Sequence, residues 1–296
     1  MKIKKAVIPI AGKGTRFLPA TKEIAKEIIP ILNVPMIHHI VVEAVESGIE
    51  QIIFVTSAGK FAVEDYFDRN LELEAFLEKA GKTKELEMIR KIGTMVDVTS
   101  VRQKEQLGLG HAVLMAQELV GQETFAVLLG DDIVMNDVPC TKQLMDVSSR
   151  HGGAPVIGVM NVPREDTSKY GIVRGTPLAN DSMTLRMEGM VEKPKPDQAP
   201  TTLATPGRYI LSPEIFSILK EIPRGAGNEY QLTDAINVLC QRRDVYAHQF
   251  KGERFDTGHL MGYLDATVDF ALRDPALRPA FVEILKQKVL KHKVTL

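Results

Sequence analysis

Short strand-like runs alternate with segments of helical periodicity through the first half of this 296-residue chain. The runs are mostly apolar and cover residues 5–10, 52–56, 96–101 and 124–129, and a helical pattern follows the first of them at residues 37–45. Apolar runs of this length are typical of strands buried on both faces of a parallel sheet, with helices as the crossovers. The alternation therefore predicts an α/β fold with a Rossmann-like, mixed but mostly parallel central sheet flanked by helices.

Two regions depart from this alternation. Residues 61–92 are highly charged and helical in pattern, and we interpret them as a helical insertion outside the sheet with an apolar stripe of Leu71, Leu73, Phe76 and Leu77. In the second half, strand-like pieces are separated by Gly, Pro, Asn and Asp, which predicts a smaller mixed sheet attached to the parallel one. The elements expected there are strands at 156–160, 171–174, 184–191 and 245–250, helices at 213–222 and 231–242, a longer helix from near His259, and a basic surface or subunit-contacting helix at 281–293.

The charge balance limits the class of ligand. Lys and Arg number 37 and Asp and Glu 38, so the net charge of -1 gives no general reason to bind nucleic acid or an anionic membrane. Cys140 and Cys240 are isolated in the sequence, which favours a reducing, cytoplasmic compartment, and we expect neither a signal peptide nor a membrane helix. The expected partner is a small molecule, and any anion site must be local.

One stretch directly after the first predicted strand is suited to binding an anion. In Ala11-Gly-Lys-Gly-Thr-Arg-Phe-Leu-Pro, the two glycines allow a tight loop that directs N–H groups at a ligand, and Arg16 adds a planar donor for phosphate. Phe17 occupies the place of the third glycine of a dinucleotide-binding loop, and no GxxxxGK[ST] string occurs, so hydride transfer and ordinary NTP hydrolysis are disfavoured. An ordinary strand-to-helix turn remains the alternative.

Lys22 and Lys26 follow four residues apart. On a helix, both ammonium groups would project from one face, where they would repel each other unless an anion is bound. Two solvated lysines remain the alternative interpretation. Taken with Arg16, the pair predicts a clamp for a triphosphate.

These motifs, with others further along the chain, resemble the sugar-1-phosphate nucleotidyltransferase family. Within that family the sequence is most similar to the bacterial UTP–glucose-1-phosphate uridylyltransferases. The matching segments lie in family order and cover most of the chain: Ala11-Gly-Lys-Gly-Thr-Arg-Phe-Leu-Pro-Ala-Thr-Lys with Lys26-Glu-Ile-Ile-Pro, Gln103 with Gly108-Leu-Gly-His-Ala, Gly130-Asp-Asp, Tyr170-Gly-Ile-Val, Val191-Glu-Lys-Pro, Gly207-Arg-Tyr-Ile-Leu, Glu229-Tyr-Gln-Leu-Thr-Asp-Ala-Ile and Phe255-Asp-Thr-Gly.

The resemblance implies a fold of the nucleotide-diphospho-sugar transferase type, with residues 1–296 as one domain. A nucleotide-binding lobe would lie mainly in 1–135 and a smaller sugar-binding lobe mainly in 136–258, followed by C-terminal helices at 259–296. The implied reaction joins UTP and glucose 1-phosphate to give UDP-glucose and pyrophosphate. Since the attacking phosphate oxygen is already ionised near neutral pH, the task is positioning and charge neutralisation rather than base catalysis.

The resemblance also implies roles on the nucleotide side. The backbone of Ala11, Gly12, Gly14 and Thr15 would hold base, ribose and phosphates, while Arg16 and Lys26 would bind the departing phosphates, with Lys22 a weaker candidate. Gln103 would read the uracil edge, with Gly108 allowing close approach of the base. Asp131 and Asp256 would hold Mg²⁺, which commonly takes one or two carboxylates beside substrate phosphates. Asp132 is counted with the nucleotide-binding residues, where it would be a third metal ligand, a neighbouring acid or a turn residue.

On the sugar side, Glu192 would accept hydrogen bonds from the hexose and Lys193 would meet its phosphate. Neighbours in a strand point to opposite faces, so both can line one pocket only if the strand ends there, as Pro194 suggests. Gly171 and Gly207 would allow close approach of the sugar, with plain turn glycines as the alternative. The catalytic set is thus Arg16, Lys26, Asp131 and Lys193.

Two alternatives to this reaction stay open. A related enzyme using dTTP or another hexose 1-phosphate shares the base edge that Gln103 would read. A non-catalytic sugar-nucleotide sensor could share the fold, although Asp131, Lys193 and Asp256 are all present. The oligomeric state is expected to be a homodimer or homotetramer.

Overall fold

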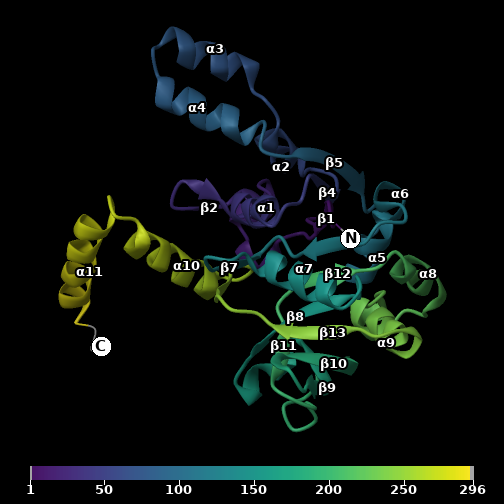
Figure 1. Ribbon diagram of the computed structural model, residues 1–296. Coiled ribbons are helices and arrows are strands. Elements are labelled where there is room, and N and C mark those ends of the chain that lie inside the picture. Colours follow the sequence, from purple (N-terminus) through teal and green to yellow (C-terminus); the bar gives the residue numbers. More distant parts are fainter. Residues whose placement is uncertain (1, 294–296) are drawn as a thin grey trace.

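The computed structural model describes residues 2–293, which are built around a 10-stranded sheet. The strand order is β11-β9-β10-β13-β8-β12-β6-β1-β4-β5 (Figure 1). These strands are β1 (Lys5–Pro9), β4 (Gln51–Thr56), β5 (Asp97–Arg102), β6 (Phe125–Leu128), β8 (Val156–Asn161), β9 (Gly171–Leu178), β10 (Asp181–Glu192), β11 (Leu203–Thr205), β12 (Arg208–Leu211) and β13 (Tyr246–Gln249). The α/β class and the flanking helices predicted from the sequence are confirmed.

The mixed strands expected in the second half are attached to the parallel strands within one sheet. Strands β6, β1, β4 and β5 are parallel to one another, and β12 then pairs antiparallel with both β6 and β8. Because it pairs on both sides, β12, whose four residues are all buried, joins the two halves into one continuous sheet. Strand β12 lies in the Gly207-Arg-Tyr-Ile-Leu motif, which carries no alternation that would reveal its position between two other strands.

Helices cover both faces of the sheet because alternate strand residues point to opposite sides. On β1, Ile8 packs with the buried residues of α1 and α7, while Val7 packs with those of α5, α8 and α9. The helices are α1 (Met36–Glu46), α2 (Phe61–Phe67), α3 (Leu71–Lys79), α4 (Thr83–Ile92), α5 (Leu109–Met115), α6 (Gln117–Val120), α7 (Cys140–Arg150), α8 (Glu214–Glu221), α9 (Leu232–Arg242), α10 (Leu260–Arg273) and α11 (Arg278–His292). Helix α7 was not anticipated from the sequence.

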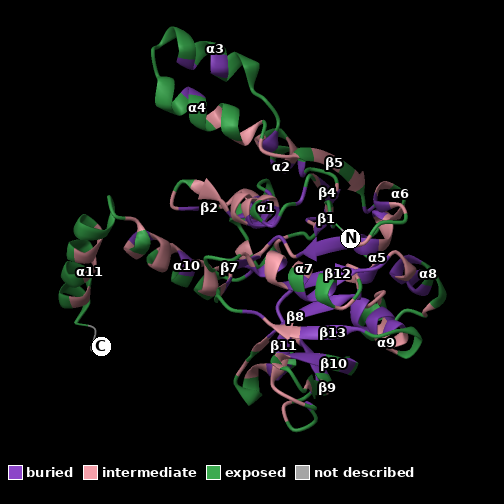
Figure 2. Cartoon of the chain, in the orientation of Figure 1, coloured by how far each residue is buried: buried purple, intermediate pink, exposed green. Residues whose placement is uncertain are grey.

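The predicted helical insertion is confirmed as α2, α3 and α4. Helices α3 and α4 project away from the sheet and are mostly exposed (Figures 1 and 2). Of the expected apolar stripe on α3, Leu77 is buried but Phe76 is 61% exposed. The two helices are held together in part by Glu74, whose carboxylate accepts from Arg69 at 2.6 Å and from Arg90 at 2.9 Å.

Two smaller strand pairs lie outside the large sheet. The first pairs β7 (Asp132–Met135) with β14 (Glu253–Asp256), and the second pairs β2 (Pro30–Ile31) with β3 (Val34–Pro35). Helix α10 begins after His259, as predicted, and α10 and α11 extend away from the body (Figure 1). Among residues 2–293, no helix combines the length and apolar character needed to cross a membrane.

Candidate functional site

The glycine loop that follows β1 is shaped by two different glycines. Gly14 has φ 64°, and a Cβ atom there would lie 3.2 Å from both Lys26 Cβ and Thr21 Cγ2, so only glycine fits comfortably. The Thr21 hydroxyl fastens this turn by donating to the Gly14 carbonyl at 2.7 Å. Gly12 has open space where its Cβ would be, which leaves room beside the backbone for a ligand.

Lys22 and Lys26 do not share a helix face, so that expectation is wrong. The loop contains three short 3-10 turns, η1 (Thr15–Phe17), η2 (Ala20–Lys22) and η3 (Lys26–Ile28), and Lys22 and Lys26 lie in different turns. The Lys22 side chain is 79% exposed beside Glu23, whereas that of Lys26 is 18% exposed. Lys26 therefore belongs to the interior of the site, and Lys22 lies at its surface.

Lys26 pairs with the first aspartate of Gly130-Asp-Asp. Its ammonium donates to Asp131 Oδ2 at 2.5 Å. Burial alone would lower the pKa of Lys26, but the carboxylates of Asp131 and Glu27 outweigh it and raise that pKa above its usual value. Burial alone would raise the pKa of Asp131, but Lys26 and Arg16 lower it. Both groups therefore stay ionised near neutral pH, and Arg16 lies close enough to act on each.

Asp131 and Asp256 are brought together by the β7–β14 pair. In its register Asp256 lies opposite Asp132, and Thr257 donates through its N–H at 2.9 Å and its hydroxyl at 2.8 Å to the Asp131 carbonyl. A Cβ atom at Gly258 would lie 2.7 Å from Asp131 Oδ2 and 3.1 Å from Asp256 Oδ1, so both carboxylates converge there. Two convergent carboxylates suit a hard cation such as Mg²⁺, whose other ligands would be water and substrate phosphates.

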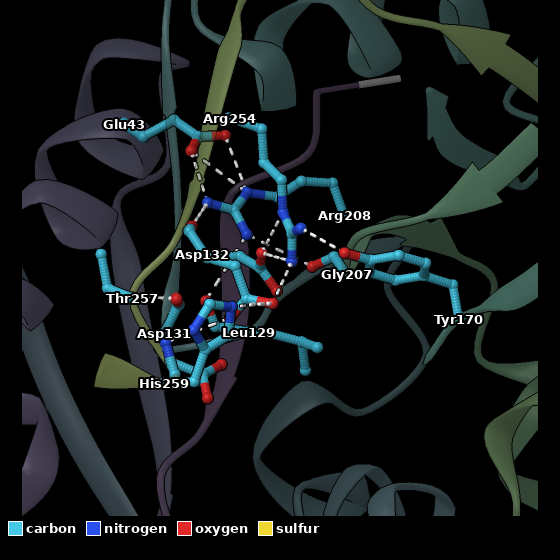
Figure 3. A network of polar contacts seen from close by, with 12 residues as sticks. Glu43, Leu129, Asp131, Asp132, Tyr170, Gly207, Arg208, Arg254, Thr257 and His259 are labelled. Atoms are coloured by element: carbon cyan, nitrogen blue, oxygen red, sulfur yellow. Dashed lines mark hydrogen bonds and ion pairs between the residues drawn. The ribbon is translucent and has the colours of Figure 1, made fainter. Parts of the chain in front are cut away.

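Arg254 occupies the space between three side chains at this point. Its guanidinium donates to Asp132 Oδ1 at 2.5 Å and to the Tyr170 hydroxyl at 2.8 Å (Figure 3). It also lies 3.2 Å from Asp256 Oδ2. Burial raises the pKa of Asp132 to about 7, against the lowering effect of Arg254. Like charges that face each other destabilise a strand pair. The positive charge of Arg254 offsets the repulsion between Asp132 and Asp256, which face each other across the β7–β14 pair.

A buried ion pair supports the Gly130-Asp-Asp turn from behind. Arg208 has no exposed surface and donates to Glu43 Oε2 at 2.8 Å, while Thr141 donates to Glu43 Oε1 through its hydroxyl at 2.6 Å. The other N–H groups of Arg208 reach the carbonyls of Leu129, Gly207 and Asp132 (Figure 3). Arg208 thus fixes the backbone on both sides of Asp131.

A cleft of about 850 Å³ opens on the side of the glycine loop. Gly12, Thr15 and Gln103 line it together with Lys22 and Lys60. The Gln103 amide nitrogen donates to the Gly108 carbonyl at 3.1 Å and lies 3.0 Å from His111 Nδ1. Burial lowers the pKa of His111, so its neutral ring can accept through Nδ1. In this arrangement the Gln103 carbonyl oxygen is the group left for a ligand.

Two glycines predicted to approach substrate also have close protein neighbours. At Gly108, φ is 94° and a Cβ atom would lie 2.7 Å from Glu229 Cβ. At Gly207, φ is 106° and a Cβ atom would lie 2.4 Å from the Leu129 side chain. Both positions need glycine because another segment of the chain packs directly against them. The Glu229-Tyr-Gln motif contacts the Gly108 loop, and the Gly207 motif contacts Leu129, next to the Gly130 turn.

The sugar-side residues lie where β10 ends. The strand stops at Glu192, and Lys193 adopts φ 44°. The chain therefore bends at the point where it must leave strand geometry for both side chains to line one pocket. Glu192 Oε2 accepts from the Thr233 hydroxyl at 2.6 Å, and Oε1 lies 3.5 Å from the Lys193 ammonium. Lys193 N–H donates to the Tyr170 carbonyl at 3.0 Å, next to Gly171. Because Tyr170 also binds Arg254, this cluster is tied to the aspartates.

Four residues of the site were not anticipated from the sequence: Glu43, Lys60, Arg208 and Arg254. Arg208 lies within a matched motif and Arg254 directly precedes one, which is the signal that could have drawn attention to them. Glu43 is an acid at a buried position of α1, and a charged residue on an otherwise apolar helix face indicates a buried partner. Lys60 precedes α2 without any motif around it.

Together these groups form a site of fixed charges. Arg16 and Lys26 carry positive charge beside the convergent carboxylates of Asp131 and Asp256, and a cleft with an amide reader adjoins them. Among the described residues, 2–293, no three His, Cys, Asp or Glu side chains gather in the manner of a ready metal cage. Such a site can bind and orient a polyanion with a cation, and its chemistry matches phosphoryl transfer by positioning and neutralisation.

Comparison with known proteins gives a consistent result. The family model described as nucleotidyl transferase matches residues 5–272. A UTP–glucose-1-phosphate uridylyltransferase of Staphylococcus epidermidis is 49% identical over 286 residues, covering 97% of this chain and 98% of its own length. The structure of a UTP-bound UGPase from Acinetobacter baumannii has a TM-score of 0.86 and 41% identity, covering 96% of this chain and 99% of its own. A UDP-glucose pyrophosphorylase complexed with UDP-glucose has a TM-score of 0.84 and 40% identity, covering 92% and 100%.

Proposed function

The chain belongs to the nucleotidyl transferase family, and we propose that it transfers UMP from UTP to glucose 1-phosphate, giving UDP-glucose and pyrophosphate. The observation that carries this proposal is the contact of Lys26 with Asp131, on which the charge of Arg16 also acts, next to a cleft that Gln103 lines. Relatives named for this activity match nearly the whole chain, and neighbours of the same fold bind UTP and UDP-glucose.

The nucleotide would bind in the cleft beside the glycine loop. The backbone of Ala11, Gly12, Gly14 and Thr15 would enclose the ribose and phosphates, and the Gln103 carbonyl oxygen would accept the N3–H of uracil. Arg16 and Lys26 would bind the phosphates that leave as pyrophosphate. Their fixed positive charge lowers the repulsion between the two anionic substrates, which is the main obstacle to the reaction.

We propose that Asp131 and Asp256 hold Mg²⁺, which when bound would supply positive charge to the triphosphate. Glucose 1-phosphate would bind at the end of β10, where Glu192 would accept from its hydroxyl groups and Lys193 would meet its phosphate, beside Gly171. One phosphate oxygen would then attack the α-phosphorus in line with the leaving pyrophosphate. Asp132, bound by Arg254, would support Asp256 rather than ligate the ion.

We also propose that the chain forms a homodimer or homotetramer in the cytoplasm. Apolar side chains are exposed along the α10–α11 arm, including Leu264 at 45% and Leu290 at 78%, which favours contact with another subunit. Cys140 and Cys240 are free thiols, as a reducing compartment permits.

Pyrophosphate release with glucose 1-phosphate and a panel of nucleotides tests the function. We expect UTP to exceed dTTP in kcat/KM by about tenfold, because one methyl group in a fitted pocket is worth ~1–3 kcal/mol. CTP should be rejected more strongly, because its N3 is an acceptor facing the Gln103 oxygen. Turnover of dTTP equal to or above that of UTP would instead identify a thymidylyltransferase. If none of the nucleotides supports pyrophosphate release, the protein would be a non-catalytic sensor.

A further inference from the structure

A buried lysine, Lys60, lies on the wall of the nucleotide cleft. Lys60 is 7% exposed and lines the cleft together with Gly12, Thr15 and Gln103. Its ammonium donates to Glu27 Oε2 at 2.6 Å. Glu27 is 1% exposed and immediately follows Lys26 in the chain. Burying both charges carries a desolvation penalty, which is recovered only if further hydrogen bonds satisfy the two groups.

The pair is incompletely satisfied within the protein. Glu27 Oε1 is buried and has no hydrogen-bond partner among the described residues. An ammonium carries three donors, of which the bond to Glu27 uses one. Buried polar groups are usually paired, so free donor and acceptor capacity beside a cleft indicates a ligand.

Glu27 also connects this lysine to the reaction centre. Its Cγ lies 3.7 Å from where a Cβ of Gly130 would be, so its side chain runs beside the Gly130-Asp-Asp turn. The negative charge of Glu27 raises the pKa of Lys26, as the larger effect of Asp131 also does, whereas burial alone would lower that pKa. Charges thus alternate from the cleft inward as Lys60, Glu27, Lys26 and Asp131.

We propose that Lys60 is a further phosphate-binding residue, which contacts the β- and γ-phosphates of UTP, and that Glu27 holds its ammonium at the cleft wall. The proposal rests on the proposed function, since it assigns a part of the same nucleotide site. Glu27 binds Lys60 directly and its charge also acts on Lys26, so it lowers the repulsion between the two lysines before the nucleotide enters. The triphosphate then takes up the remaining donors of Lys60.

Equilibrium titration of the full chain with UTP and with UMP tests this assignment. We expect Lys60→Met to raise the Kd of UTP by about tenfold and to leave the Kd of UMP within twofold, because UMP lacks the β- and γ-phosphates. Lys5→Met is the matched control: Lys5 is a partly buried lysine paired at 2.6 Å with Glu123, at the opposite end of β1. It should leave both constants unchanged.

A second pair of variants separates ligand binding from stability. Removing Lys60 alone strands the Glu27 carboxylate, whereas Lys60→Met with Glu27→Gln removes both charges and should restore much of the melting temperature. We expect this double variant to bind UTP about tenfold more weakly than Glu27→Gln alone. Equal affinity of these two variants, or equal loss for UTP and UMP in Lys60→Met, would overturn the proposal. Failure of the unaltered chain to bind UTP would instead contradict the proposed function.

Discussion

Replacing Asp256 by alanine is expected to lower Mg²⁺-dependent turnover by about 10³-fold while the protein stays folded. Asp256 is one of two carboxylates that converge beside Gly258, and with one removed a cation loses half of its protein ligands there. A bound cation stabilises the transition state of phosphoryl transfer by several kcal/mol, and ~4 kcal/mol corresponds to that factor. The Asp256 side chain is partly exposed and its contacts are local, so the fold should tolerate the change.

The measurement is kcat over a range of Mg²⁺ concentrations, with the melting temperature recorded in parallel. Treatment of the unaltered enzyme with a chelator should abolish turnover, and added Mg²⁺ should restore it. Asp265→Ala is the matched control, because Asp265 is an exposed acid on α10, close in sequence to Asp256. Near-normal turnover of Asp256→Ala, with the same Mg²⁺ dependence as the unaltered enzyme, would exclude Asp256 as a metal ligand.

Replacing Lys26 by methionine should lower kcat by ~10²–10³-fold, the usual cost of removing one group that stabilises developing charge. Lys26 is the ammonium that touches Asp131 at 2.5 Å, beside Arg16, at the point where the leaving phosphates would lie. Because Asp131 and Glu27 raise its pKa against burial, Lys26 should stay charged throughout the neutral range. Between about pH 7 and 9, deprotonation of Lys26 should therefore cause no loss of turnover in the unaltered enzyme.

Initial rates with both substrates varied will check this expectation, with circular dichroism to establish folding. Lys26→Arg keeps the charge on a longer, planar group and should recover only part of the rate. Lys22→Met supplies the comparison that the structure suggests, since Lys22 is a surface lysine of the same loop and should matter much less. A kcat for Lys26→Met within threefold of the unaltered enzyme would remove Lys26 from the reaction centre.

Local patterns predicted the parts of the fold that depend on near neighbours in the chain. The apolar runs at β1, β4 and β6 are buried because such runs can be satisfied only inside a sheet covered on both faces. The start of α10 after His259 and the helical insertion followed from local periodicity in the same way. The end of β10 at Glu192 was foreseen from Pro194, two residues later.

Features that join distant segments could not be predicted in this way. Arg208 and Glu43 are 165 positions apart, and neither carries a local sign of the other. The place where the mixed part of the sheet joins the parallel part could not be predicted for the same reason, because the four residues of β12 say nothing about pairing with both β6 and β8. Gly108 and Gly207 were correctly seen as special, but the neighbours that exclude a side chain, Glu229 and Leu129, come from elsewhere in the chain.

The expectation for Lys22 and Lys26 failed for a local reason. Spacing of four residues places side chains on one face only in an α-helix, and this loop instead forms short 3-10 turns separated at Glu23 to Ala25. As a result Lys26 turns inward to Asp131 while Lys22 faces solvent. The family motif placed Lys26 in the site, whereas helical geometry alone would have treated the two lysines alike.

The transfer of UMP to glucose 1-phosphate is tested most directly by following the phosphorus atoms of UTP. With UTP labelled at the α-phosphate, glucose 1-phosphate and Mg²⁺, we expect the label to appear in UDP-glucose, in equal amount to the pyrophosphate released. With UTP labelled at the γ-phosphate, all label should appear in pyrophosphate. Label recovered as UMP or as inorganic phosphate, or pyrophosphate release that does not depend on glucose 1-phosphate, would contradict the account.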